Sequence, residues 1–162
     1  LAEAMKREGF SVGGIWTESL EDLGHAQLML HDLETNESKL FADSKFEPNQ
    51  NGVRHGRYII FWESIYAGIK AIGRGVGKDL LIIDEVGGLE LKLQGFFPVL
   101  HTLKRASHVL LVIPPTIIDE LSQLLKLGPE YELTLVTEAN RNDVLADLTA
   151  RFCEAIRAGK WS

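Results

Sequence analysis

The stretch Leu80-Leu81-Ile82-Ile83-Asp84-Glu85 places two adjacent carboxylates directly after four apolar residues. A short apolar run of this kind is typical of a strand that is buried on both faces of a parallel sheet. In open α/β sheets, ligands bind outside the carboxyl ends of the strands, so Asp84 and Glu85 are expected at a ligand site. An Asp in that position can hold Mg²⁺ through water, while the neighbouring Glu can orient or deprotonate a water molecule.

This division of roles is the Walker B arrangement of P-loop proteins that hydrolyse ATP or GTP. The alternative is a strand end that carries two solvated, structural acids.

A glycine-rich segment at residues 73–78 looks like the phosphate-binding loop itself, but its spacing is wrong. Ile72 stands where the first glycine of a P-loop is needed, and Asp79 replaces the Ser or Thr that reaches Mg²⁺. We interpret this segment as the loop that ends a helix.

Strands and helices are predicted to alternate along most of the chain, which favours an α/β fold with a mostly parallel sheet and helices on both faces. Helices are predicted at residues 1–8, 61–72, 96–104, 116–127 and 142–158, the last capped by Asn142. Strands are predicted at residues 12–17, 27–33, 38–42, 80–83, 108–113 and 131–136. The first two strands flank a polar turn at 18–25 and form an N-terminal antiparallel hairpin. Residues 43–56 are predicted to be a long loop.

The composition fits one globular domain over residues 1–162, with 45% hydrophobic and 25% charged residues. A net charge of −6 argues against nucleic acid as a partner, because that role requires a basic surface. One cysteine, Cys153, cannot form an internal disulfide, so a cytoplasmic location is expected. No apolar run is long enough to span a membrane. The five histidines lack metal-ligand spacing, which argues against a zinc site.

Three blocks, in this order, resemble a small family of P-loop nucleoside triphosphatases known from thermophiles and, in animals, as cancer-related nucleoside triphosphatase. Residues 12–18 resemble the family segment VGGFYTEE, residues 84–91 resemble DEIGxMEL, and residues 136–142 resemble VTxENR. Gly56-Arg57-Tyr58 occupies the place of a family Gly-Lys/Arg-Tyr. The resemblance spans essentially the whole chain and implies a P-loop NTPase-like fold. The family's first strand and its Gly-Lys-Thr loop are not found here, and we expect them immediately upstream of Leu1.

The resemblance implies a graded set of site residues. Asp84 is expected to bind Mg²⁺ and Glu85 to polarise the attacking water. The expected nucleotide-binding residues are Gly87, Gly88, Glu90, Thr17, Glu18, Arg57, Asn140 and Arg141. Glu90 can equally cap the next helix, and Asn140 with Arg141 can form a capping turn. Trp16, Trp62 and Phe61 are expected to fill the core rather than to stack on a base.

The function implied is Mg²⁺-dependent hydrolysis of a nucleoside triphosphate, ATP or GTP with broad base tolerance, to the diphosphate and phosphate. No acceptor pocket can be recognised in the sequence, so hydrolysis is favoured over a small-molecule phosphotransferase of related layout. A non-catalytic nucleotide-binding or regulatory domain that kept the fold is the other alternative.

Overall fold

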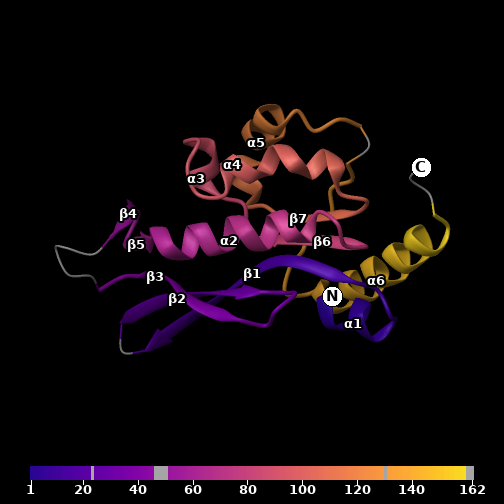
Figure 1. Ribbon diagram of the computed structural model, residues 1–162, viewed down its shortest axis with the longest axis horizontal. Helices are drawn as coiled ribbons and strands as arrows, with labels where there is room; N and C mark the ends of the chain where they lie inside the picture. The colour runs from indigo at the N-terminus through magenta and orange to yellow at the C-terminus, as the bar shows by residue number, and fades with distance from the viewer. Residues whose placement is uncertain (23, 46–50, 130, 160–162) are drawn as a thin grey trace.

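The computed structural model describes residues 1–22, 24–45, 51–129 and 131–159 (Figure 1). A seven-stranded sheet runs through it in the order β4-β5-β3-β2-β1-β6-β7. Its strands are β1 (Val12–Asp22), β2 (His25–Asp32), β3 (Ser38–Asp43), β4 (Gly52–His55), β5 (Tyr58–Phe61), β6 (Leu80–Asp84) and β7 (Val109–Val112). The α-helices are α1 (Ala2–Arg7), α2 (Trp62–Gly75), α3 (Gly88–Leu91), α4 (Phe97–Leu100), α5 (Ile118–Leu125) and α6 (Arg141–Arg157). Two 3-10 helices, η1 (His101–Arg105) and η2 (Pro115–Ile117), complete the set.

The sheet is mixed, with helices on both faces (Figure 1). Strands β1, β6 and β7 are parallel, whereas β1–β2, β2–β3, β3–β5 and β4–β5 pair antiparallel. The predicted N-terminal hairpin is therefore confirmed, while the parallel character that we expected of most of the sheet is confined to the end that carries β6. That end holds the carboxylates of interest.

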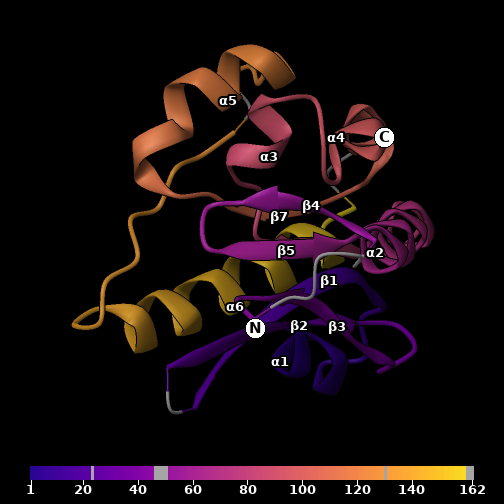
Figure 2. The same cartoon turned by 90° about the vertical axis from the view of Figure 1, so that its left-hand side faces the viewer.

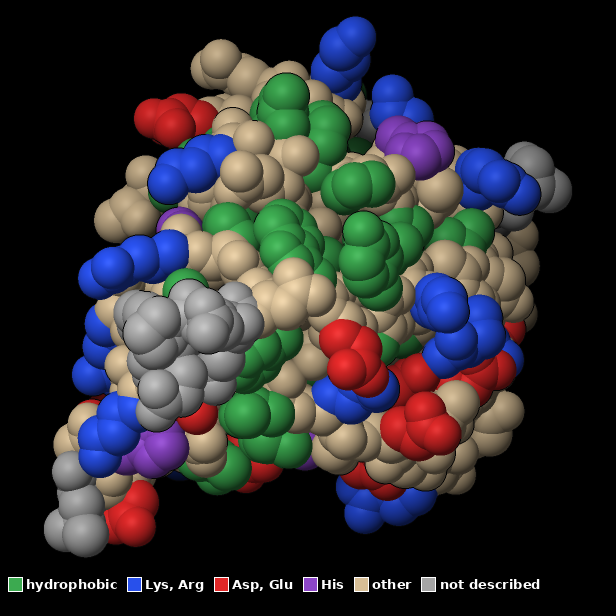
Figure 3. Space-filling model, turned by 60° about the vertical axis from the view of Figure 1, so that its left-hand side comes forward, with side chains coloured by type: hydrophobic (Ala, Val, Ile, Leu, Met, Phe, Trp, Pro, Cys, Tyr) green, Lys and Arg blue, Asp and Glu red, His purple; other side chains and the backbone are tan. Residues whose placement is uncertain are grey.

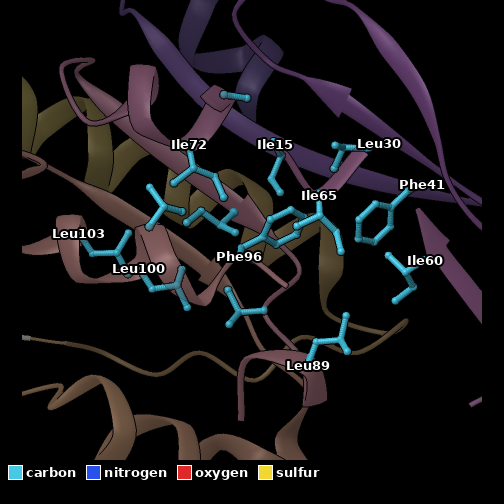
Figure 4. Packing of buried hydrophobic residues seen from close by; sticks show 14 of the residues in the cluster. Ile15, Leu30, Phe41, Ile60, Ile65, Ile72, Leu89, Phe96, Leu100 and Leu103 are labelled. Carbon is cyan, nitrogen blue, oxygen red and sulfur yellow. The ribbon is translucent and has the colours of Figure 1, made fainter. Parts of the chain in front are cut away.

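The larger core lies between the sheet and helices α2 to α5. Leu81 and Ile83 of β6 project into it, and Phe41 stacks on Phe96 with ring centroids 5.6 Å apart. Figure 4 shows both rings in this core together with Ile65 of α2. Burying such side chains is the main stabilising contribution, at roughly 25 cal/mol per Å² of apolar surface.

A smaller core lies on the opposite face, under α1 and α6. Leu80 and Ile82 of β6 project into it, so β6 is buried on both faces, as its apolar run predicted. Met5 of α1 meets Cys153 of α6 here, with 3.9 Å between their sulfur atoms. Both residues are buried.

Glycines at the start of β1 allow a close approach between strand and helix. A Cβ on Gly13 would lie 2.6 Å from the Cα of Gly75 in α2, so the two backbones are almost in contact. Gly14 has φ +105° and lies so close to β6 that a Cβ would meet the Ile82 carbonyl oxygen at 1.9 Å. The segment at 73–78 thus ends a helix, as we interpreted it, although residues 73–75 are still part of α2 and only the rest is loop. Gly75 allows the close packing against β1.

Several predicted boundaries are wrong for identifiable reasons. The predicted turn at 18–25 is mostly strand, because β1 continues to Asp22 and its exposed polar residues pair across to β2. The predicted loop at 43–56 contains β4, which pairs with β5 around a turn at Gly56 and Arg57. Residues 46–50 of that loop lie outside the described residues. The helix predicted at 96–104 is α4 followed by η1, and the one at 116–127 is η2 followed by α5.

The strand predicted at 131–136 does not form among the described residues. Leu133, Leu135 and Val136 are instead 68%, 67% and 55% exposed in an extended segment. A strand forms only by pairing with another strand, and no strand of the described sheet, which ends at β7, pairs with this segment. The final helix is close to its predicted span, although its N-cap is Asn140 rather than Asn142.

Candidate functional site

Strand β6 delivers Asp84 and Glu85 to the carboxyl end of the parallel part of the sheet. Its neighbours are β1, where Ile15 is the partner of Ile83, and β7, where Val112 is the partner of Asp84. Asp84 is the last residue of the strand, as the sequence predicted. After it, the chain leaves the sheet, tied by the hydrogen bond from the Val86 N–H to the Val112 carbonyl.

Asp84 lines a cavity of about 500 Å³ on the face of the sheet that α1 covers. The other lining residues come from the start of the chain, from β1 and β2 with the turn after β2, and from β6 and β7: Leu1, Ala2, Glu3, Trp16, His31, Asp32, Leu33, Asn36, Ile82, Leu110 and Val112. Figure 3 views the molecule from the side toward which β1 runs, and hydrophobic side chains gather near the centre of this face. The lining of the cavity is mainly apolar, and its polar members include the carboxyl groups of Glu3, Asp32 and Asp84.

Both carboxyls have raised pKa values. Burial raises the pKa of Asp84, and the negative charge of Glu85 raises it further. Desolvation also raises the pKa of Glu85, even though this residue keeps contact with solvent. Neither carboxylate forms an ion pair with a Lys, Arg or His of the described residues. Two adjacent acids without a counter-cation are a costly arrangement, which is typical of a binding site rather than of a structural pair.

We expect Asp84→Asn to be more stable than the wild type at pH 7 in chelator-containing buffer. The raised pKa means that the folded protein favours the protonated carboxyl of Asp84. Ionising this carboxyl therefore destabilises the fold, and the loss of stability grows as pH rises from the pKa of the unfolded chain through the pKa of the folded protein. The amide removes that penalty. Denaturant titrations should therefore show a stability gain at pH 7 that shrinks toward zero near pH 3.5, a little below the unfolded pKa of about 3.9. A variant less stable at pH 7 would show that Asp84 has a stabilising partner.

Glu90 fixes the turn that follows β6. Its buried carboxylate accepts the backbone N–H groups of Gly87 and Phe96, both at 2.8 Å. Burial raises the pKa of Glu90, and these two N–H donors oppose that effect. The bond from Gly87 is the capping arrangement at the start of α3, so of the two roles anticipated for Glu90 the geometry shows the structural one.

Gly87 is the N-cap of α3, and Gly88 is the first residue of that helix. A Cβ on Gly87 would lie 3.7 Å from Glu85 Oε1, and one on Gly88 would lie 3.2 Å from Cε1 of His55 in β4. The hairpin β4–β5 thus comes up beside α3, as Figure 2 shows. Substituting Gly88 would push the His55 ring away.

Thr17 lies close to Asp84, and Glu18 follows it on β1. The Thr17 hydroxyl donates a hydrogen bond of 3.2 Å to the Asp84 carbonyl, which ties the end of β6 to β1. The Glu18 carboxylate lies 3.2 Å from Nε2 of His31 on β2. The structure therefore brings Thr17 to Asp84, whereas Glu18 contacts His31, and neither residue lines the cavity.

Arg57, Asn140 and Arg141 do not line the cavity. Arg57 is in the β4–β5 turn, where it contacts the Tyr58 hydroxyl at 3.1 Å and Glu21 at 3.8 Å. The Asn140 side chain accepts the Thr137 N–H at 2.7 Å and donates to the Leu135 carbonyl, so it forms the turn before α6. Arg141 is the exposed first residue of that helix. Nucleotide contacts by these three residues stay a prediction.

Sequence reasoning missed Trp16 and His31 as members of the site. Trp16 was expected in the core, but it is 38% exposed and lines the Asp84 cavity, so that expectation is wrong. The signal was strand alternation: Ile15 points into the larger core, so its neighbour Trp16 must point to the other face. Trp62, by contrast, packs partly against the larger core, and Phe61 is partly buried.

Comparisons with known proteins place the chain in a family. The sequence model of a family described as NTPase matches residues 1–149. The chain is 28% identical over 150 residues to a protein of Methanosarcina acetivorans named Nucleoside-triphosphatase THEP1, covering 91% of this chain and 82% of that one. It is 31% identical over 152 residues to a protein of the same name from Pyrococcus abyssi, covering 91% and 79%.

A third relative of that name, from Methanosarcina barkeri, is 29% identical over 149 residues, covering 90% and 82% of the two chains. No solved structure matches the chain. Among the described residues, no helix combines the length and the apolar character that crossing a membrane requires. Since the family model covers nearly all of its length, the chain belongs to the NTPase family of nucleoside-triphosphatase enzymes.

Proposed function

We propose that this protein hydrolyses a nucleoside triphosphate to the diphosphate and phosphate with Mg²⁺, using Asp84 and Glu85 as its Walker B pair. The observation that carries the proposal is the position of Asp84. A strand buried on both faces holds it at the wall of a 500 Å³ cavity, next to a second carboxylate and without a cationic partner among the described residues. The family match supplies the class of substrate.

Mg²⁺ fits the donor set at this point. The described residues contain no group of three or more His, Cys, Asp or Glu side chains that could cage a metal ion. Mg²⁺ is commonly held by one or two carboxylates together with water and substrate phosphates, and such a site needs no cage. Asp84 is the residue that would hold it, and a cation there would relieve the repulsion between Asp84 and Glu85. When bound, Mg²⁺ would neutralise part of the negative charge on the phosphates.

Glu85 would act on the attacking water. Desolvation raises the pKa of its carboxylate above the ordinary value, which makes it a better proton acceptor than a Glu with an unshifted pKa. Thr17 would hold the Asp84 backbone in place through its hydroxyl, and Glu90 would fix the turn that follows Glu85. Hydrolysis is favoured over phosphotransfer because these groups provide for a water molecule.

A phosphate-binding loop is part of the proposal. The outer edge of β7 pairs with no described strand, and the exposed apolar residues Leu133, Leu135 and Val136, which follow β7 in the chain, belong to no described strand. One additional parallel strand on β7 would offer these residues a hydrogen-bonding neighbour. Such a strand would end at the same edge of the sheet as Asp84, where a loop could bring backbone N–H groups to the phosphates.

Phosphate release from ATP and GTP by the complete gene product tests the proposed function. We expect turnover with Mg²⁺ and none with a chelator, with similar rates for the two nucleotides. Mg²⁺ should also raise the melting temperature of the wild type but not of Asp84→Asn, because the variant lacks the carboxylate that holds the ion. Nucleotide binding without turnover would point to a regulatory domain, and transfer to an added small molecule would point to a phosphotransferase.

A further inference from the structure

Trp16 and His31 form a stacked aromatic pair in the Asp84 cavity. Their ring centroids are 4.2 Å apart and their planes differ by 13°. They are partners across the antiparallel pair β1–β2, so the backbone sets their alignment. Of the described residues that line the cavity, these two alone carry rings.

The pair is held rigidly from the His31 side. Nδ1 of His31 lies 2.7 Å from the hydroxyl of Ser38 in β3, and Nε2 lies 3.2 Å from the Glu18 carboxylate. With both ring nitrogens engaged, the imidazole cannot turn without losing a hydrogen bond. Trp16 therefore rests on a fixed support, and the stack presents a preorganised flat surface.

That surface adjoins the proposed catalytic pair. Ile15 is the partner of Ile83 in the parallel pair β1–β6, so the next residues, Trp16 and Asp84, are neighbours on adjacent strands. Both line the same cavity, whose apolar surface includes Ile82 and Leu110. A ligand with a charged end at Asp84 would therefore meet the indole within the same space.

We propose that the Trp16–His31 stack is the platform on which the base of the nucleoside triphosphate lies. This inference rests on the proposed function, because it takes the nucleotide as the ligand of the Asp84 cavity. The base is the flat, aromatic part of that ligand, and an aromatic ring stacks on any base. A platform of this kind accounts for broad base tolerance, since it reads no hydrogen-bonding edge.

A purely structural role does not explain the exposure of Trp16. Ile15 supplies the core contact of this part of β1 and is fully buried, whereas Trp16 leaves 38% of its surface open. An indole held open beside a carboxylate costs hydrophobic stabilisation unless a ligand covers it. The stack on His31 covers one part of the ring and leaves the remainder to the cavity.

Calorimetric titration of the complete protein with Mg²⁺–ATP, Mg²⁺–GTP and Mg²⁺–tripolyphosphate tests the platform, because tripolyphosphate carries the charge but no base. We expect Trp16→Leu to weaken binding of both nucleotides about tenfold and that of tripolyphosphate hardly at all. Trp16→Phe should restore most of the affinity. Leu20→Ala removes a 43% exposed side chain from the same strand outside the cavity and should change nothing.

Unchanged nucleotide affinity in Trp16→Leu, or an equal loss for tripolyphosphate, would overturn the platform. The platform would also be overturned if the wild type bound ATP no more tightly than tripolyphosphate. Failure of the proposed function has a different signature: ATP is bound in a Trp16-dependent way, yet no phosphate is released. Thermal melts of each variant establish that the folded population is the same.

Discussion

Glu85→Gln is expected to bind nucleotide normally and to lose about 10²–10⁴-fold in the rate of hydrolysis. The amide keeps the size of the side chain and can still hydrogen bond, but it cannot accept the proton of the attacking water. Because Glu85 makes no ion pair among the described residues, the change should leave the fold intact. Steady-state phosphate release, with nucleotide affinity measured in parallel, provides the readout.

The matched control is Glu21→Gln, which removes another exposed acid from the end of β1, where it pairs with Arg57 at 3.8 Å. This variant should turn over at the wild-type rate. The wild-type rate should fall at acid pH as Glu85 becomes protonated. That fall should begin at a higher pH than for an ordinary Glu, because desolvation raises the pKa of Glu85. Near-normal hydrolysis by Glu85→Gln would remove Glu85 from the mechanism.

Gly14→Ala is expected to lower the free energy of unfolding by about 3 kcal/mol or more. The new Cβ would lie 1.9 Å from the Ile82 carbonyl oxygen and 2.9 Å from its carbon, and both of these atoms belong to the backbone of β6. The φ of +105° adds strain for any residue with a side chain. To relieve the contact, β1 and β6 must separate. Urea denaturation of purified variants measures the loss.

Two other glycines separate the effect of the steric contact from the effect of the positive φ. Gly9 has φ +88° but open space around its Cβ position, so Gly9→Ala isolates the conformational strain, at about 1–2 kcal/mol. Gly73 is in α2, again with open space, and Gly73→Ala should stabilise by a few tenths of a kcal/mol or more. If Gly14→Ala costs no more than Gly9→Ala, the contact between the strands is not as tight as the geometry indicates.

The sequence predicted those parts of the fold that depend on local pattern. The apolar run at 80–83 is buried on both faces, and the isoleucines of 61–72 lie on a helix, because each pattern is set by a single element. Prediction from the sequence failed for strands, because a strand forms only when another strand is available to pair with it. The pattern predicts a loop where β4 forms, because β4 exists only through its pairing with β5, and it predicts a strand at 131–136, which pairs with no strand of the described sheet.

The same division holds for the site. Asp84 and Glu85 were placed correctly because a strand end has a defined position in an α/β sheet. Trp16 and His31 were missed because their stacking depends on the register between β1 and β2, which no short motif encodes. Glu90 looked like a ligand or a cap from sequence, and only its two hydrogen bonds reveal the cap.

The contact between Met5 and Cys153 gives the molecule a built-in chemical reporter. Cys153 is the chain's single cysteine, and its thiol is enclosed where α6 rests on α1. Cys153 is only 7% exposed, although it borders a surface pocket along α6. A thiol reagent should therefore react slowly with the closed molecule and faster when that helix lifts away, so the labelling rate rises with these openings. Since α1 also borders the Asp84 cavity, a ligand that clamps the start of the chain would slow the reaction of a sulfur atom that it never touches.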